Sequence, residues 1–287
     1  MIYGVIGAAL LLGSVWFSPW TFGIFFAAVQ AVMLWEFYRM MRAGGYAPAT
    51  GIGLVGSLFI FVAVGVMQHT VPAVSGASAG LTPTLPGWNT ALWVTPKAWL
   101  LPALVLPLLL ILRELRRWPR HGQPFINFSV TLGGLFYVSI PMALLVVIAH
   151  VNQHYDYRRV FALLFLIWAS DIGAYAAGKN FGKHKLAPSI SPGKTWEGWA
   201  GGFLLTLLVG WALGLLLPDV PLAHRLVAAG VVAVFAPLGD LAESVLKRSV
   251  SVKDSGTIMP GHGGLLDRFD AFLLVLPVLA LLQLLAG

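Results

Sequence analysis

Long apolar runs recur along the whole chain and limit its fold more than any other feature. A helix that crosses a bilayer needs about 20 mostly apolar residues. With 58% hydrophobic residues, the chain carries more apolar surface than one soluble core of 287 residues could bury. The sequence therefore predicts an all-α, polytopic integral membrane helical bundle, folded as a single domain over residues 1–287. We expect about nine transmembrane helices, at 2–17, 20–41, 51–72, 97–112, 127–150, 158–178, 199–217, 222–239 and 267–286.

The basic residues give this bundle an orientation. When the connecting loops are assigned alternately to the two sides, 14 of the 18 Lys and Arg fall on one side, and Lys97, Arg158, Arg159 and Arg225 fall on the other. Cytoplasmic loops carry the excess of basic residues, so we expect the N-terminus inside and the C-terminus outside. The net charge of +7 is scattered between apolar segments and forms no single stripe, which argues against nucleic-acid binding. With no cysteine, thiolate metal sites and a cysteine nucleophile are excluded.

Acidic residues gather near the cytoplasmic ends of the last helices. Asp171 lies eight residues before Lys179, so it is about 12 Å deeper along its helix. Ionisable residues within a span usually face a pathway or a site. We expect Asp171 to line a polar cavity in the membrane, and the alternative is a structural hydrogen bond to a neighbouring helix.

Two further acidic groups follow. Asp240, Glu243, Ser244 and Lys247 share one helical face, although Glu243 and Lys247 could also form an ordinary pair at a solvated helix end. Asp267 and Asp270 fall in the first turn of the last span, where the helix dipole alone would favour carboxylates. Oxygen donors without cysteine suit Mg²⁺ better than zinc, and Mg²⁺ usually arrives with phosphates. We therefore expect Mg²⁺, and a second cation is left open.

Residues 178–198, "GKNFGKHKLAPSISPGKTWEG", place lysines, hydroxyls and glycines on a cytoplasmic loop. "SPGKT" is not a phosphate-binding P-loop, because Pro188 stands where that motif needs glycine and no strand is expected before it. Lysines and exposed backbone amides can still hold a polyphosphate. The alternative is a loop that is basic only because it faces the cytoplasm.

The segment "SVLKRSVSVKDSGTIMPGHGGLLDRFD", residues 244–270, resembles the signature of the phosphatidate cytidylyltransferase (CDP-diacylglycerol synthase) family. "SDIGAYAAGKNFGKHKLAPSISPGKTWEG" is similar to the family's other recurring block, whereas the N-terminal half resembles the family only in its pattern of spans and in "WEFYRM". Met259 stands where a branched or aromatic residue is expected, and no basic segment precedes the first run. The matched signature positions are Ser244, Lys247, Arg248, Lys253, Asp254, Pro260, His262, Gly263, Gly264, Asp267, Arg268 and Asp270.

This resemblance implies an enzyme of phospholipid biosynthesis. The phosphate of phosphatidic acid would attack the α-phosphate of CTP, which gives CDP-diacylglycerol and pyrophosphate. Asp240 and Asp267 would be metal ligands, supported by Glu243. The implied catalytic residues are Asp240, Asp267, Lys247, Arg248, Lys253, Asp254 and His262, and the implied substrate-binding residues are Asp171, Ser191, Lys194, Thr195, Ser244 and Arg268.

Two other classes of function stay open at this stage. A transporter or proton-coupled carrier could use Asp171 and Asp240 as a relay, but it would show paired broken helices in two related halves, and the sequence shows neither. A lipid kinase, or an alcohol phosphotransferase that uses CDP-lipids, is the nearer alternative. We expect CTP, phosphatidic acid and membrane lipid as partners, and a homodimer is left open. We also expect the bacterial inner membrane as the location, with a catalytic region at about 158–287 that faces the cytoplasm.

Overall fold

The computed structural model describes residues 2–70, 96–119, 123–256 and 263–286, and they are mostly helical. Two short antiparallel hairpins interrupt the helices: β1 (His150–Val151) with β2 (His154–Tyr155), and β3 (Lys185–Ala187) with β4 (Ser191–Thr195). The helices are α1 (Ile2–Phe17), α2 (Pro19–Ala43), α3 (Thr50–Thr70), α5 (Pro96–Arg117), α6 (Pro124–Gly134), the π-helix η1 (Leu135–Ser139), α7 (Ile140–Ile148), α8 (Tyr157–Phe181), α9 (Trp196–Ala212), the short 3-10 helix η2 (Leu213–Leu215), α10 (Leu222–Ser249) and α11 (Leu266–Ala286).

Seven helical segments in the described part are long and apolar enough to cross a membrane. They are Pro19–Ala43, Thr50–Gln68, Pro124–Ile148, Tyr157–Phe181, Trp196–Leu215, Leu222–Ser249 and Leu266–Leu285. The expected all-α, polytopic membrane class is therefore confirmed. The apolar part of α1, Ile6–Phe17, is shorter, and α5 is not among the seven. The total of nine spans stays a prediction.

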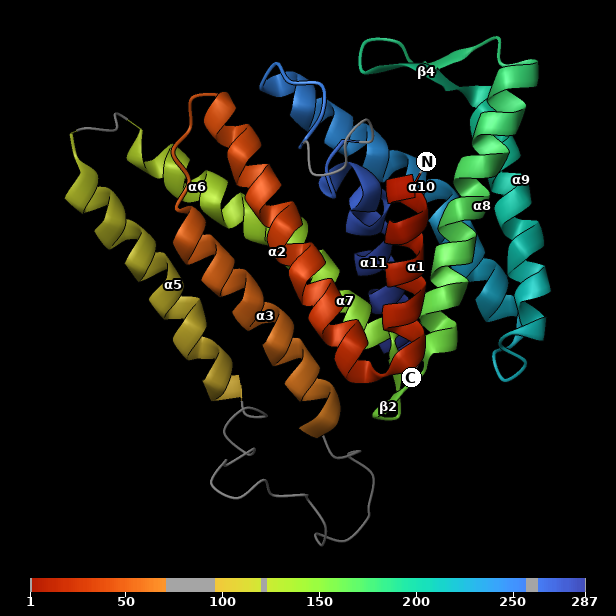
Figure 1. The fold of residues 1–287 in the computed structure, drawn as a ribbon, viewed down its shortest axis with the longest axis horizontal. Coiled ribbons are helices and arrows are strands. Elements are labelled where there is room, and N and C mark those ends of the chain that lie inside the picture. The colour runs from red at the N-terminus through yellow and green to blue at the C-terminus, as the bar shows by residue number, and fades with distance from the viewer. Residues whose placement is uncertain (1, 71–95, 120–122, 257–262, 287) are drawn as a thin grey trace, which may run out of the picture.

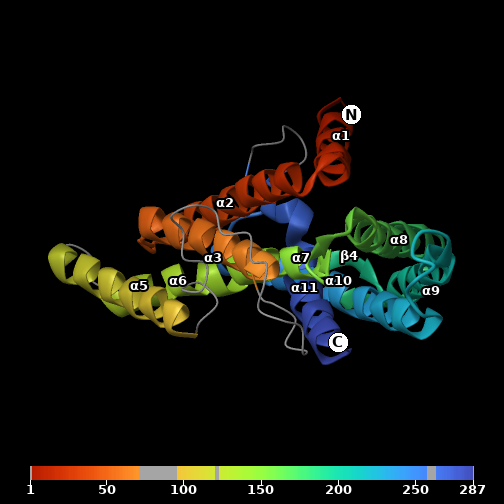
Figure 2. The same cartoon turned by 90° about the horizontal axis from the view of Figure 1, so that it is seen from below.

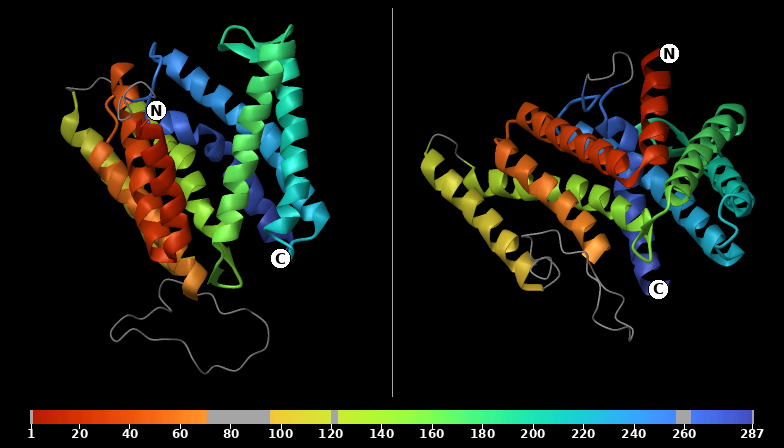
Figure 3. Two further views of the ribbon diagram at one scale, coloured as in Figure 1. Left: turned by 45° about the vertical axis from the view of Figure 1, so that its right-hand side comes forward. Right: turned by 60° about the horizontal axis from the view of Figure 1, so that its bottom comes forward.

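The helices form a broad bundle with α5 at one edge and α8 to α10 at the opposite edge (Figure 1 and Figure 2). Between these edges lie α2, α7 and α11. Figure 3 shows α8 and α9, green to cyan, side by side on the side away from α5, in yellow. Hairpin β3–β4 and the C-terminal end of α10 lie at one end of the bundle, whereas hairpin β1–β2 and the C-terminus lie at the other (Figure 1).

Local signals in the sequence explain where several helices begin. Ser18 caps α2 in a capping box with Thr21, and Pro19 occupies the first turn, where its missing N–H does no harm. Asp156 caps α8 by accepting a hydrogen bond from Arg158 N at 3.0 Å. Burial acts to raise the pKa of Asp156, but hydrogen bonds from Arg158 outweigh burial, so this pKa lies below its usual value.

Small residues bring α8 and α9 into close contact. A Cβ atom added at Gly173 of α8 would lie 2.7 Å from the carbonyl oxygen of Gly201, and one added at Gly202 would lie 2.7 Å from that of Ser170. Small residues let membrane helices approach closely enough for their backbones to touch. These glycines therefore fix the two helices that flank hairpin β3–β4.

The N-terminal half packs around Tyr38 of α2, which is fully buried. Its hydroxyl donates a hydrogen bond to Thr131 O of α6 at 2.7 Å. Deeper in the bundle, Gln30 Nε2 donates to Ser57 Oγ at 2.8 Å, and Ser139 Oγ donates to the same oxygen at 2.9 Å. These contacts join α2, α3 and the α6–η1–α7 span, and they hold α2 in a fixed position beside α11.

Candidate active site

A buried ionic network joins the end of α10 to the start of α11. Lys247 Nζ lies 2.6 Å from Glu243 Oε2 and 2.7 Å from Asp267 Oδ1. The exposed fractions of these side chains are 12%, 1% and 13% for Lys247, Glu243 and Asp267. Glu243 and Lys247 therefore form no ordinary pair at a solvated helix end, because both are buried and Asp267 completes the group. One ammonium therefore contacts two carboxyl groups, one from its own helix and one from α11.

The loop before α11 holds the second oxygen of Asp267. Oδ2 accepts hydrogen bonds from Ser255 N at 3.0 Å, Ser255 Oγ at 2.9 Å and Gly264 N at 2.8 Å. Gly263 has a φ of +80°, and a Cβ atom there would lie 2.6 Å from Asp267 Oδ2. A side chain at position 263 would therefore suffer both backbone strain and a clash. The glycines of this segment bring backbone close to a carboxylate.

A second ionic group surrounds Asp240, about two helical turns before Lys247 on α10. Lys194 Nζ, from hairpin β3–β4, lies 2.7 Å from Asp240 Oδ2 and donates to Pro237 O at 3.1 Å. Ser244 Oγ donates to Asp240 Oδ1 at 3.3 Å. The side chain of Asp240 is 45% exposed, so its carboxylate is open to a ligand in a way that Asp267 is not. Lys194 thus connects the hairpin to α10.

Asp171 of α8 and Asp270 of α11 belong to the surroundings of Asp240. Asp171 interacts electrostatically with Asp240 and Lys194, and Asp270 interacts with Asp240, Asp171 and Lys194. Three acidic side chains from three helices therefore lie within electrostatic range of Lys194. Carboxylates so arranged repel one another unless one of them is protonated or further positive charge is present.

The other predicted site residues lie around these two groups. Thr195 is buried and caps α9, because its hydroxyl oxygen accepts from Gly198 N at 3.1 Å. Ser191 is half-buried at the start of β4. Exposed positions at the same end are occupied by Arg248, Lys253, Asp254 and Arg268. His262 lies outside the described residues. The roles of all of these side chains in catalysis or substrate binding stay predictions.

Two residues of the N-terminal half reach this region, and sequence reasoning gave neither a role. Glu36 of α2 is fully buried and accepts a hydrogen bond from Leu266 N at 2.8 Å. Tyr137 lies in the π-helical turn η1, and its buried hydroxyl has no hydrogen-bond partner among the described residues. It interacts electrostatically with Glu243 and Asp270. A charged residue within "WEFYRM" was the available signal for Glu36, whereas a π-helical turn has no comparable sequence pattern.

The donor atoms of both groups are hard oxygens of the type that Mg²⁺ prefers. Within the described part of the chain, no three His, Asp or Glu side chains are gathered closely enough to form a metal site by themselves. Mg²⁺ at phosphate-transfer sites is commonly held by one or two carboxylates, with phosphate and water oxygens completing the shell. Glu243 Oε1 is buried and has no hydrogen-bond donor among these residues. The residues therefore fit a cation that arrives with a phosphate substrate.

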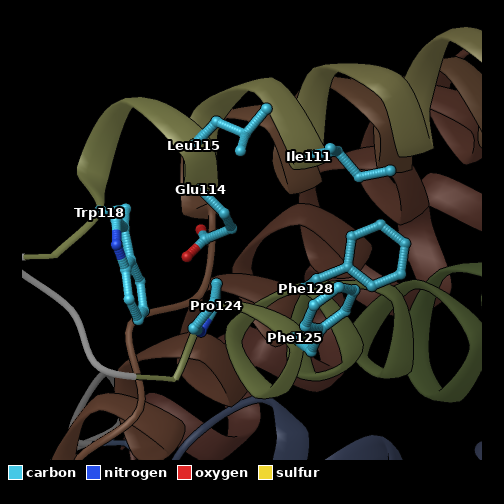
Figure 4. Close-up of a pocket in the computed structure, with 7 residues that line it drawn as sticks. All are labelled: Ile111, Glu114, Leu115, Trp118, Pro124, Phe125 and Phe128. Carbon is cyan, nitrogen blue, oxygen red and sulfur yellow. The ribbon is translucent and has the colours of Figure 1, made fainter.

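A separate pocket of about 310 Å³ lies between α5 and α6 (Figure 4). Its walls are mostly apolar and include Leu115 and Trp118 on one side and Phe125 and Phe128 on the other. Glu114 also lines it, and its carboxylate is paired with Arg113. None of the acids or lysines of the two ionic groups lines this pocket, so it is not part of the candidate active site.

Comparison with known proteins places these features in a family. The pattern described as "Cytidylyltransferase family" matches residues 1–285. The phosphatidate cytidylyltransferase of Bacillus subtilis is 45% identical over 152 residues, which are 52% of this chain and 55% of that protein. The phosphatidate cytidylyltransferase of Staphylococcus saprophyticus is 42% identical over 159 residues, which are 55% of this chain and 60% of that protein. The chain thus spans little more than half the length of these relatives.

Proposed function

Because the chain belongs to the cytidylyltransferase family, we propose that it transfers the cytidylyl group of CTP to phosphatidic acid. A phosphate oxygen of phosphatidic acid attacks the α-phosphorus of CTP and forms a new P–O bond. The bond from the α-phosphorus to the oxygen that bridges to the β-phosphate breaks, and pyrophosphate leaves. The products are CDP-diacylglycerol and pyrophosphate. The relatives named phosphatidate cytidylyltransferase support this substrate pair.

The observation that carries the proposal is the pair of ionic groups at one end of α10. Transfer at phosphorus needs positioning and charge neutralisation more than covalent help from the protein. Lys247 and Lys194 are held at fixed positions by Asp267 and Asp240. We propose that these lysines, with the exposed Arg248 and Lys253, neutralise the phosphates of CTP and of the lipid. The attacking phosphate is largely ionised near neutral pH, so no strong general base is required.

We also propose that Asp240 and Asp267 hold Mg²⁺, with Glu243 supporting them. Bound there, Mg²⁺ would neutralise charge on the attacking and leaving oxygens. Asp240 is partly exposed and Asp267 is fixed by Ser255 and Gly264, so one ligand is accessible and the other is positioned in advance. In the structure each carboxylate has its own lysine partner. The proposal requires these lysines to shift toward phosphate when the substrate binds.

We propose that the active site faces the cytoplasm from the bacterial inner membrane. Both ionic groups lie toward the end of the bundle that carries hairpin β3–β4. The hairpin and the end of α10 contain Lys185, Lys194, Lys247 and Arg248, and basic residues favour the cytoplasmic side. Substrate CTP would then reach the site from the cytoplasm and phosphatidic acid from the bilayer.

The test is an assay of purified protein with CTP labelled at the α-phosphate and vesicles that contain phosphatidic acid. We expect labelled CDP-diacylglycerol and unlabelled pyrophosphate in equal amounts. Without the lipid, neither product should form. A lipid kinase would instead release a nucleoside diphosphate, and an alcohol phosphotransferase would form no product, because its donor is a CDP-lipid and not CTP. Either of those results would contradict the proposal.

A further inference from the structure

Glu36 is a carboxylate that the fold buries completely, although α2 is a membrane-spanning helix from the other half of the chain. Its exposed fraction is 0%. A buried carboxylate costs several kcal/mol unless it is hydrogen-bonded, and acids inside spans usually have a function. The contacts of Glu36 therefore indicate what it is for.

Those contacts are with the loop that precedes α11. Glu36 Oε2 accepts a hydrogen bond from Leu266 N, one of the first amides of α11, at 2.8 Å. The first amides of a helix have no partner within the helix, and a carboxylate is favoured there. Glu36 thus caps the start of α11 although it is distant in sequence. The amide that it binds, Leu266 N, belongs to the residue immediately before Asp267.

The loop also closes around the Glu36 carboxylate. A Cβ atom added at Gly256 would lie 2.2 Å from Glu36 Oε1, and one added at Gly264 would lie 2.5 Å from both carboxylate oxygens. Both positions therefore have room only for glycine while Glu36 stays in place. Two segments of the loop, on either side of residues 257–262, are held against the same side chain.

These same segments hold Asp267. Ser255 adjoins Gly256 and donates to Asp267 Oδ2 through its amide and its hydroxyl, and the Gly264 amide donates to the same oxygen. Glu36 does not hydrogen-bond Asp267, but it interacts with it electrostatically. We infer that Glu36 is a positioning residue, which holds Ser255, Gly264 and the start of α11 where they orient the Asp267 carboxylate. This inference rests on the proposed function for the reaction that Asp267 serves.

A pair of substitutions of similar size separates this role from simple packing. Glu36→Gln keeps an oxygen that can accept from Leu266 N, whereas Glu36→Leu fills similar volume without an acceptor. The matched control is Gln30→Leu, because Gln30 is also fully buried on α2 but bonds Ser57 and not the loop. Each variant is assayed for kcat and for KM of CTP, and amide hydrogen exchange is followed in the peptide that covers residues 263–268.

We expect Glu36→Leu to lower kcat by about tenfold or more, because small displacements of catalytic groups are costly, and to speed exchange in residues 263–268. Glu36→Gln should restore most of both properties. Gln30→Leu should lower the melting temperature without a change in kcat per folded molecule or in exchange at 263–268. If exchange in residues 263–268 were the same in Glu36→Leu and the parent, the inference would be overturned, whether or not the parent makes CDP-diacylglycerol. If the parent made no CDP-diacylglycerol, the proposed function would be overturned instead. Equal loss of kcat in the Gln and Leu variants would also overturn the inference.

Discussion

The ammonium group of Lys247 lies between two carboxylates that have little contact with solvent. Asp267 has four hydrogen-bond donors around it, from Lys247, the amide and hydroxyl of Ser255, and the amide of Gly264. Such a network fixes the direction of both oxygens of Asp267. Stability also depends on these side chains, because a partner lost from a buried ionic group leaves a charge without compensation. Under the proposed function, the same side chains serve the reaction.

Replacing Lys247 with methionine should destabilise the protein by about 3–5 kcal/mol, because Asp267 then loses its cationic partner in a largely buried site. Arg248→Met is the matched control, since Arg248 is the next residue and is exposed. Its effect on stability should stay within about 0.5 kcal/mol. Thermal unfolding in detergent, followed by tryptophan fluorescence, measures both. Equal melting temperatures for the two variants would contradict the described network.

Gly263→Ala should reduce activity by at least about tenfold while the helices stay folded. The methyl group would meet Asp267 Oδ2, and alanine at a φ of +80° is strained by roughly 1–2 kcal/mol. Gly230→Ala is the control. Gly230 lies on α10, the same helix as Asp240, and a Cβ atom added there would have no neighbour within 4 Å. It should keep activity and gain about 0.5–1 kcal/mol of stability. If Gly263→Ala kept the parent's activity, the close approach of the Gly263 backbone to the Asp267 carboxylate would not be required for the reaction.

At the scale of elements, apolar runs predicted the helices well because each span must present apolar side chains to lipid or to a neighbour. The apolar run 222–239 covers only part of α10, which continues to Ser249. The helical spacing of Asp240, Glu243 and Lys247 predicted this continuation, which hydropathy alone could not. Residues 185–195 were expected only as a loop, but they form hairpin β3–β4, and Lys194 of this hairpin is paired with Asp240 of α10.

Lys194→Ala tests the function of that hairpin. The substitution removes a positive charge from the proposed nucleotide site and also frees the hairpin from Asp240 and Pro237 O. We expect the KM for CTP to rise by about tenfold, with a smaller effect of Lys185→Ala, because Lys185 is exposed on the same hairpin. Steady-state kinetics at saturating phosphatidic acid give both values. If the two variants had the same KM for CTP as the parent, the hairpin would be basic only because of its side of the membrane.

At the scale of the whole molecule, sequence reasoning singled out the C-terminal residues of the two ionic groups but not the N-terminal residues that lie near them. The signature segment and the lysine-rich hairpin were recognised because their residues are close together in sequence. Glu36 and Tyr137 come from the other half of the chain. Glu36 reaches the site because α2 packs against α11, and Tyr137 of η1 lies within electrostatic range of Glu243 and Asp270. The grouping of Asp240 with Asp171 and Asp270 likewise follows from three-dimensional proximity that no spacing in the sequence encodes.

The proposed orientation of the bundle can be tested by labelling, because the chain has no cysteine. Cysteine introduced at Ser189 or Lys253, both exposed, should react with a membrane-impermeant maleimide only after the cells are permeabilised. Cysteine at His154, exposed on hairpin β1–β2, should react in intact cells. The opposite pattern would reverse the orientation that the distribution of basic residues predicts.

The most direct test of the account is the yield of CDP-diacylglycerol from Asp240→Asn and Asp267→Asn across a Mg²⁺ titration. Asparagine keeps the shape of each side chain and removes the charge that the proposed cation requires. We expect each variant to lose about a hundredfold or more of the parent's activity, and we expect chelation of Mg²⁺ to abolish the activity of the parent. Near-parental activity of either variant at limiting Mg²⁺ would contradict the account, because that carboxylate would then be a structural partner of its lysine and not a ligand in catalysis.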